Sequence, residues 1–234
     1  MHMLKYIINF CLLFAFVNSY SQQQLSSKQQ KDTIQYKTGY GLRIGIDISK
    51  PFIGVFDKSY RGLEVVGDYR ISKSWYIASE VGYEKETTSE DFFNFTSKGS
   101  YVKIGANYNA YKNWLDMNNE IYVGLRYGLS VFDQTLNNYT PNVGNTYFPS
   151  VNISTPRATS KLTAHWAEFQ LGIKVETFKN LFVSFSGSFK VMASVNNPTN
   201  FKSLYAPGFN RIFESNTGFG FHYTISYLIP FVNK

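Results

Sequence analysis

The last stretch of the chain, residues 216–231, alternates between two kinds of residue. Every second residue from Phe219 to Phe231 is large and apolar, and most of the residues between them are small or polar. A period of two places the apolar side chains on one face of a β-strand. The stretch is long for a half-buried strand of a soluble protein, whereas a strand that crosses a bilayer needs about 9–11 residues with an apolar outer face.

The same alternation recurs earlier in the chain, at residues 40–48, 62–71, 75–85, 101–111, 121–131, 163–175 and 181–191. The connections are short at residues 72–74, 112–120 and 176–180, and long at residues 49–61, 86–100, 132–162 and 193–217. Short turns on one rim and long loops on the other are typical of bacterial outer-membrane proteins. The pattern predicts an all-β fold: an eight-stranded antiparallel up-and-down transmembrane β-barrel with long extracellular loops, short periplasmic turns and both termini on the periplasmic side.

A soluble lipocalin-like barrel is the main rival to this fold. It would turn the apolar face inward and the charged face outward, and the period alone does not say which face is which. The number of charges on the non-apolar face and the unequal lengths of the connections favour the membrane barrel.

The N-terminus has the features of a secretory signal. Lys5 precedes an apolar run at residues 7–17, and the small-x-small sequence Ser19-Tyr20-Ser21 follows, which predicts cleavage between Ser21 and Gln22. We therefore expect a signal peptide at residues 1–21, a flexible polar periplasmic tail at 22–37 and the barrel at 38–234. The single cysteine, Cys11, lies within the apolar run, so the mature chain has no disulfide and no cysteine ligand or nucleophile.

Composition agrees with an exported barrel in the bacterial outer membrane. Aromatic residues make up 18% of the chain, but the mean hydropathy of −0.23 argues against a helical membrane protein. The formal net charge is +7. Because an exported chain meets no nucleic acid, we interpret this charge as attraction to anionic lipopolysaccharide and outer-membrane lipids or to an acidic partner.

Charged residues of both signs occupy the face opposite to the apolar one. An eight-stranded barrel is just wide enough for side chains to fill it, and buried charges are costly unless they are paired. We expect a closed polar network in the lumen and no open pore. Its predicted members are Arg43, Asp47, Glu64, Asp68, Arg70, Glu80, Glu84, Lys103, Arg126, Glu168, Lys174 and Lys190.

No catalytic, cofactor-binding or metal-binding constellation stands out. His222 has inward parity and is expected to be part of the polar plug. His165 has outward parity near the loop rim, where lipid A deacylases carry a His-x-Ser pair, but the residue two positions later is Ala167. Hydrolysis needs a nucleophile held against a base, so the protein is predicted not to be an enzyme.

Aromatic residues are unusually frequent in the predicted loops. They can pack on each other as a cap or lie among lipid headgroups, or they can form a docking surface, because aromatic residues dominate interface hot spots. We favour docking slightly. The candidate partner-binding residues are Phe92, Phe93, Phe95, Tyr147, Phe148, Phe201, Tyr205, Phe209 and Phe213.

The terminal stretch resembles the last strand of outer-membrane barrels, which the barrel-assembly machinery reads as an insertion signal. Asn216, Gly218, Phe221 and Tyr223 match that pattern. The chain as a whole resembles small barrels of the outer-membrane protein A and X type. The runs EVVGDYRISKSWYIASEVGYE, YVKIGANYNAY and EIYVGLRYG look like a family of uncharacterised outer-membrane barrels, and this resemblance implies no catalytic motif.

These features predict a non-enzymatic membrane anchor or scaffold subunit that docks a surface or membrane protein through its aromatic loops. By analogy, one home for such a subunit is the barrel-assembly machinery, where a small barrel can hold surface lipoproteins. The alternatives are an enzyme that modifies lipid A or phospholipids, and a stand-alone barrel for adhesion or membrane integrity.

Overall fold

The computed structural model describes residues 39–111, 118–141, 151–199 and 201–233. The predicted signal peptide, its cleavage site at Ser21 and Gln22, and the predicted tail lie outside the described residues, as do Tyr147 and Phe148. No helix among the described residues is long and apolar enough to span a membrane.

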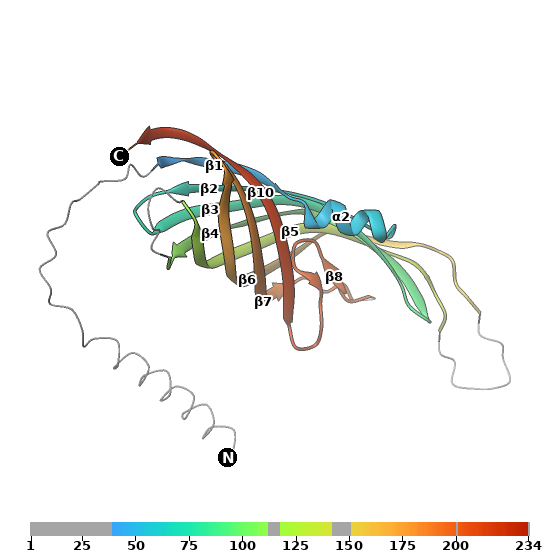
Figure 1. Cartoon of the computed structure of the whole chain (residues 1–234). Helices are drawn as coiled ribbons and strands as arrows, with labels where there is room; N and C mark the ends of the chain where they lie inside the picture. The colour runs from blue at the N-terminus through green and yellow to red at the C-terminus, as the bar shows by residue number, and fades with distance from the viewer. Residues whose placement is uncertain (1–38, 112–117, 142–150, 200, 234) are drawn as a thin grey trace, which may run out of the picture. The chain divides into compact units, whose positions relative to one another are not determined.

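Eight antiparallel strands close into a ring in the order β1-β10-β7-β6-β5-β4-β3-β2 (Figure 1). Each strand of the ring pairs with its neighbours along the chain, and β1 pairs with β10 to close the barrel. The prediction of an all-β, eight-stranded up-and-down barrel is confirmed. The strands are β1 (Gly39–Asp47), β2 (Tyr60–Arg70), β3 (Trp75–Ser89), β4 (Phe93–Asn109), β5 (Glu120–Tyr139), β6 (Arg157–Phe178), β7 (Leu181–Val195) and β10 (Thr217–Asn233).

The outer face of the barrel is apolar and the lumen is polar. Large apolar side chains from every strand are between 37% and 65% exposed, among them Ile44, Val65, Ile77, Ile104, Leu125, Leu171, Phe185 and Ile225. Charged and hydroxyl side chains at the alternate positions are buried. This is the distribution of a membrane-spanning barrel and the reverse of the soluble rival.

Strand length rises around the ring and makes one side of the barrel taller than the other. β1 has 9 residues and β2 has 11, whereas β5 has 20 and β6 has 22. The prediction of a loop is therefore wrong for most of residues 86–100 and for both ends of residues 132–162. Residues 86–89, 93–100, 132–139 and 157–162 belong to paired strands, and only residues 90–92 separate β3 from β4.

The remaining elements lie in two of the connections on the loop side. The helix α2 (Ser49–Phe56) follows β1, and β8 (Tyr205–Ala206) and β9 (Asn210–Arg211) form a small hairpin between β7 and β10 (Figure 1). Pro51 fits in the first turn of α2, where its missing N–H has no helical acceptor. The pairing of β1 with β10 ends at Asp47 and Thr224, and α2 begins at this point.

Candidate functional site

The loop-side half of the lumen is filled by an apolar plug. Phe209 and Ala206 of the β8–β9 hairpin are fully buried and pack with barrel residues that include Tyr101 and Trp166. The Phe209 and Trp166 rings meet edge to face with their centroids 6.0 Å apart. The connection between β7 and β10 therefore folds back into the mouth of the barrel.

Several of the predicted docking aromatics lie inside this plug or beside it. Phe95, Tyr205 and Phe209 are at most 6% exposed, so the prediction that they form a docking surface is wrong. They are buried because the loop folds inward and supplies apolar partners for them. Phe93 and Phe201 are half-buried and pack on Phe95. Of the predicted set within the described residues, Phe92 and Phe213 are well exposed, at 64% and 55%.

Below the plug, the lumen holds the predicted charged residues. Near the short-turn rim, Arg43 bridges Asp68 at 2.6 Å and Glu120 at 2.5 Å, and Lys174 bridges Asp68 at 2.5 Å. Arg70 lies at the edge of this group, where its guanidinium and that of Arg43 both lie over the Tyr76 ring. Its guanidinium donates to the backbone carbonyls of residues 72 and 73 in the β2–β3 turn.

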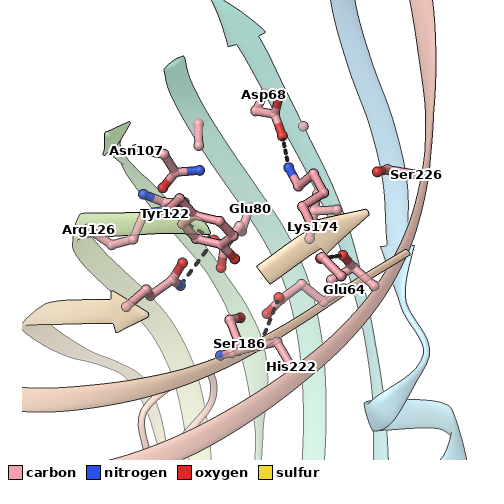
Figure 2. A pocket seen from close by; sticks show the side chains of 16 residues that line it. Glu64, Asp68, Glu80, Asn107, Tyr122, Arg126, Lys174, Ser186, His222 and Ser226 are labelled. Atoms are coloured by element: carbon pink, nitrogen blue, oxygen red, sulfur yellow. Dashed lines mark hydrogen bonds and ion pairs between the residues drawn. The ribbon is translucent and has the colours of Figure 1, made fainter. Parts of the chain in front are cut away.

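The middle of the lumen is built around Lys103, which is fully buried. Its ammonium pairs with Glu80 and lies 3.2 Å from Oε2 of Glu64. Arg126 also pairs with Glu80, at 3.0 Å (Figure 2). These residues come from four different strands, so their ion pairs tie the walls of the barrel together across its axis.

Glu84 joins both loop-side elements to the barrel. One carboxylate oxygen accepts from Lys50 of α2 at 2.6 Å, and the other accepts from the Tyr205 hydroxyl at 2.9 Å and the Gly208 amide at 2.8 Å. Burial disfavours the charged form of Lys50, but the carboxylates of Glu84 and Glu64 outweigh it and raise the pKa of Lys50 well above its usual range. Lys190 adds a further link, because its ammonium donates to the Gly208 carbonyl at 2.8 Å.

His222 lies at the centre of a cluster of carboxylates. Its Nδ1 is 3.0 Å from Asp47 Oδ2 and 3.5 Å from Glu64 Oε1, and its Nε2 is 3.6 Å from Glu168 Oε1. Figure 2 shows His222 and Glu64 pointing toward each other across the lumen. The parity of His222 predicted its inward direction, but parity does not show which residues of other strands it meets.

Two cavities reach this cluster. A cavity of about 40 Å³ lies in the lumen, where its lining includes Glu64 and His222 (Figure 2). A larger cavity of about 490 Å³ lies on the loop side, between α2, the β8–β9 hairpin and β10. Its lining includes Lys50, Lys190 and His222. His222 is therefore reachable from the loop side, and the closed lumen stays a prediction.

The two histidines among the described residues have different surroundings. Ser188 Oγ lies 3.4 Å from His222 Nε2, on the side of the ring away from Asp47, but Ser188 lines neither of the two cavities that His222 lines. A substrate in these cavities therefore does not reach this hydroxyl. His165 faces outward, and its Nδ1 is 2.7 Å from the Tyr127 hydroxyl.

Sequence reasoning missed several members of the lumen network, among them Lys50, Glu120, Tyr101 and Tyr205. Lys50 lies in a segment predicted to be a loop, and Glu120 lies at the edge of a predicted turn. The hydroxyl of Tyr101 donates to Glu64 at 2.5 Å, and Tyr101 has the inward parity of its strand. That parity is a signal that identifies it once the strand is recognised.

The residues of the predicted insertion signal lie at the loop-side end of β10. Asn216 precedes the strand and has a positive φ of 54°. Gly218 is buried, and a side chain at this position would point at the ring of Phe209. Phe221 and Tyr223 point outward and are exposed. Their reading as an insertion signal stays a prediction.

One protein-family model, described as "Domain of unknown function (DUF6048)", matches residues 3–234 of the chain. No curated protein matches the sequence. Among solved structures, the chain is similar to Ail, the attachment invasion locus protein of Yersinia pestis. The TM-score is 0.42 at 10% sequence identity, over 81% of this chain and 97% of that chain.

Proposed function

The chain belongs to the DUF6048 family, and we propose for it a function that rests on the geometry of the barrel. The protein is a non-enzymatic anchor in the bacterial outer membrane, and it holds a partner protein at its loop-side rim. The observation that carries this proposal is an exposed aromatic and arginine patch on the part of the barrel that rises above the apolar belt.

The taller side of the barrel extends beyond what the membrane requires. A strand needs about 9–11 residues to cross the bilayer, and β6 has twice that number. Lys85 and Lys98 are register partners on β3 and β4, and both are exposed on the outer face. Charged side chains at these positions mark the upper limit of the apolar belt, so the β3–β4 hairpin beyond them stands in water.

Phe92 lies in the turn at the tip of this hairpin and is 64% exposed. The neighbouring Glu90 pairs with Arg211 of β9 at 2.7 Å, and the Arg211 guanidinium lies 5.8 Å from the centroid of the Phe213 ring. We call Phe92, Arg211 and Phe213 the rim patch. Lipid does not account for its aromatic rings, because they lie beyond the belt, and aromatic and arginine residues are the types enriched at interface hot spots.

The closed lumen supports the same conclusion. Ion pairs occupy the middle of the barrel, and the β8–β9 hairpin occupies much of its mouth. The outer surfaces are therefore the better candidates for contact with a partner protein. The side chains at the centre of the lumen argue against a wide conduction path there.

Site-specific photo-crosslinking in the native outer membrane tests this function. A photoreactive residue at position 92 or 213 is expected to form one defined adduct with a partner protein, which mass spectrometry then identifies. Position 178 is the matched control, because Phe178 is 73% exposed at the opposite, short-turn rim.

A double variant gives the second arm. Phe92→Ser with Phe213→Ser is expected to weaken the complex about a hundredfold or more, since hot-spot residues contribute about 2 kcal/mol each, while Phe178→Ser leaves it intact. Subunits of the barrel-assembly machinery are one identity that the adduct can reveal. The proposal fails if positions 92 and 213 give no adduct in the membrane, or if the double variant retains its partner.

A further inference from the structure

We infer that Asp47, Glu64 and His222 form a binding site for a divalent transition-metal ion in the lumen. These three side chains come from β1, β2 and β10, and each offers one ligand atom. All three ligand atoms lie within 4.8 Å of one another. The inference is independent of the function proposed above.

The spacing of the ligand atoms gives His222 one good hydrogen bond, to Asp47, and leaves Glu64 slightly too far away for a second. Nδ1 of His222 is 3.0 Å from Asp47 Oδ2 and 3.5 Å from Glu64 Oε1. A tetrahedral ion with bonds of about 2.0–2.2 Å separates neighbouring ligand atoms by about 3.2–3.6 Å, so the contact to Glu64 already has this spacing and the contact to Asp47 must open by a few tenths of an ångström. A single N–H at Nδ1 cannot donate well to two carboxylates, whereas one ion binds all three atoms at once.

A second observation in favour of the metal site is an unsatisfied oxygen of Glu64. The residue is fully buried, and its Oε1 has no hydrogen-bond donor among the described residues. The other oxygen, Oε2, is already engaged by the Tyr101 hydroxyl at 2.5 Å and by the Lys103 ammonium at 3.2 Å. A buried acceptor without a donor is costly, and this one is directed at the same nitrogen as Asp47.

The two carboxylate oxygens of Asp47 also have different roles. Its Oδ1 accepts from the backbone amides of Ser49 at 2.9 Å and Tyr223 at 3.2 Å, and from the Ser49 hydroxyl at 2.6 Å. These donors fix the carboxylate and leave Oδ2 for the cluster. On the far side of the imidazole, Glu168 Oε1 faces Nε2. A carboxylate behind a histidine is the outer-shell arrangement that holds metal-binding imidazoles in place and orients the ligating nitrogen.

The charges buried in the lumen come close to balance. Among the described residues, seven carboxylates are buried in it: Asp47, Glu64, Asp68, Glu80, Glu84, Glu120 and Glu168. Six lysine and arginine side chains are buried with them: Arg43, Lys50, Lys103, Arg126, Lys174 and Lys190. With a neutral His222 the difference is one negative charge, which a protonated His222 cancels in the free protein and a bound cation would cancel in its place.

The chemistry of the ligands and the access route define the ion. One imidazole nitrogen with two carboxylate oxygens suits Zn²⁺ and its first-row neighbours, which bind nitrogen and oxygen ligands together. The loop-side cavity of about 490 Å³ has His222 in its lining and gives the ion a way in. Spacing along the chain gave no sign of this site, because the ligands lie on three strands that only the closed barrel brings together.

Metal titration of the refolded full-length barrel in detergent tests the site. After treatment with a chelator, Zn²⁺ followed by calorimetry is expected to bind with one equivalent per chain, and Zn²⁺ is expected to raise the unfolding midpoint. His222→Gln and Glu64→Gln should each reduce the affinity at least tenfold. His165→Gln is the matched control and should bind normally, because His165 faces outward and contacts Tyr127.

Wild-type protein loaded with Co²⁺ keeps the inference testable if a lumen variant fails to fold. X-ray absorption should then show one imidazole nitrogen and carboxylate oxygens around the ion. Absence of saturable Zn²⁺ binding to the wild type would overturn the inference. Binding that survives His222→Gln, or a Co²⁺ shell without imidazole, would overturn it as well.

Discussion

Glu84→Ala is the substitution that most directly tests how the barrel holds its loop-side elements. Glu84 is fully buried, and it binds Lys50 of α2 through one oxygen and Tyr205 and Gly208 of the plug through the other. The variant therefore removes the contacts that fix two separate elements to one strand. We expect both elements to loosen together.

The size of the effect follows from these contacts. Removing one partner of a buried ion pair costs about 3–5 kcal/mol, and the lower end applies here because Lys50 keeps Glu64 at 3.6 Å. The hydroxyl of Tyr205 and the amide of Gly208 each lose an acceptor, at about 1–3 kcal/mol apiece. We expect a total loss of about 5 kcal/mol in the free energy of unfolding.

Urea unfolding of the refolded barrel measures this loss. With a dependence on urea of about 2.5 kcal/mol per molar, the midpoint should fall by about 2 M. Trp166 is a natural reporter, because it is fully buried against Phe209 of the plug, and its fluorescence should shift to the red in the variant even without urea. Limited proteolysis should cut between β7 and β10 sooner than in the wild type.

Glu90→Ala is the matched control for this experiment. Glu90 also pairs with a cation of the loop side, Arg211, but both side chains are substantially exposed, and exposed pairs contribute about 0–1 kcal/mol. A Glu84→Ala variant that unfolds at the same urea concentration as Glu90→Ala, with unchanged protease resistance, would refute the role assigned to Glu84.

Three further predictions concern the plug, the wall and the lumen. Phe209→Ala should cost about 3–5 kcal/mol in urea unfolding because it empties a fully buried site, whereas Phe213→Ala should change stability by less than about 0.5 kcal/mol; equal effects would contradict the plug. Gly105→Ala should lower the yield of refolded barrel, because a Cβ there would lie 1.8 Å from the Leu125 carbonyl oxygen, and Gly187→Ala, with open space around it, should refold normally. Purified protein in planar bilayers should show no steady conductance, and a reproducible channel-sized step would disprove the closed lumen.

The eight strands were predictable because membrane-facing strands repeat every two residues, and the repeat fails where the membrane ends. Lys85 and Thr87 occupy the outward positions of β3 beyond the belt. Because these outward residues are polar like the inward ones, the alternation of apolar and polar residues disappears. The paired end of the strand therefore has a sequence that resembles a loop. The helix α2 was missed for a related reason: its Ser49–Phe56 segment is short and mostly apolar, and Pro51 argues against a helix interior.

The candidate site was only partly predictable. Parity along a strand shows that Glu64 and His222 face inward, but it does not show that β2 and β10 bring them within 3.5 Å of each other. Barrel closure through β1 sets that distance. The aromatic loop residues show the same limit, since Phe209 and Phe213 are four positions apart and differ entirely in exposure. Only the folding of the loop into the mouth separates them.

The lumen and the rim patch are mechanically connected through the β8–β9 hairpin. Arg211 and Phe213 follow directly on the segment whose Gly208 is held by Glu84 from one side and by Lys190 from the other. The position of the rim patch therefore depends on charges buried inside the barrel. Lys190 is buried in the lumen and does not touch the partner protein. The variant Lys190→Met should nevertheless weaken binding of the partner protein about as much as loss of one aromatic residue of the rim patch, while leaving the ring of strands intact. Crosslinking from position 92 should persist in this variant and crosslinking from position 213 should fall, because Phe92 is held by the β3–β4 hairpin and Phe213 by the plug. Equal losses at both positions would mean that the lumen supports the whole barrel rather than this one surface.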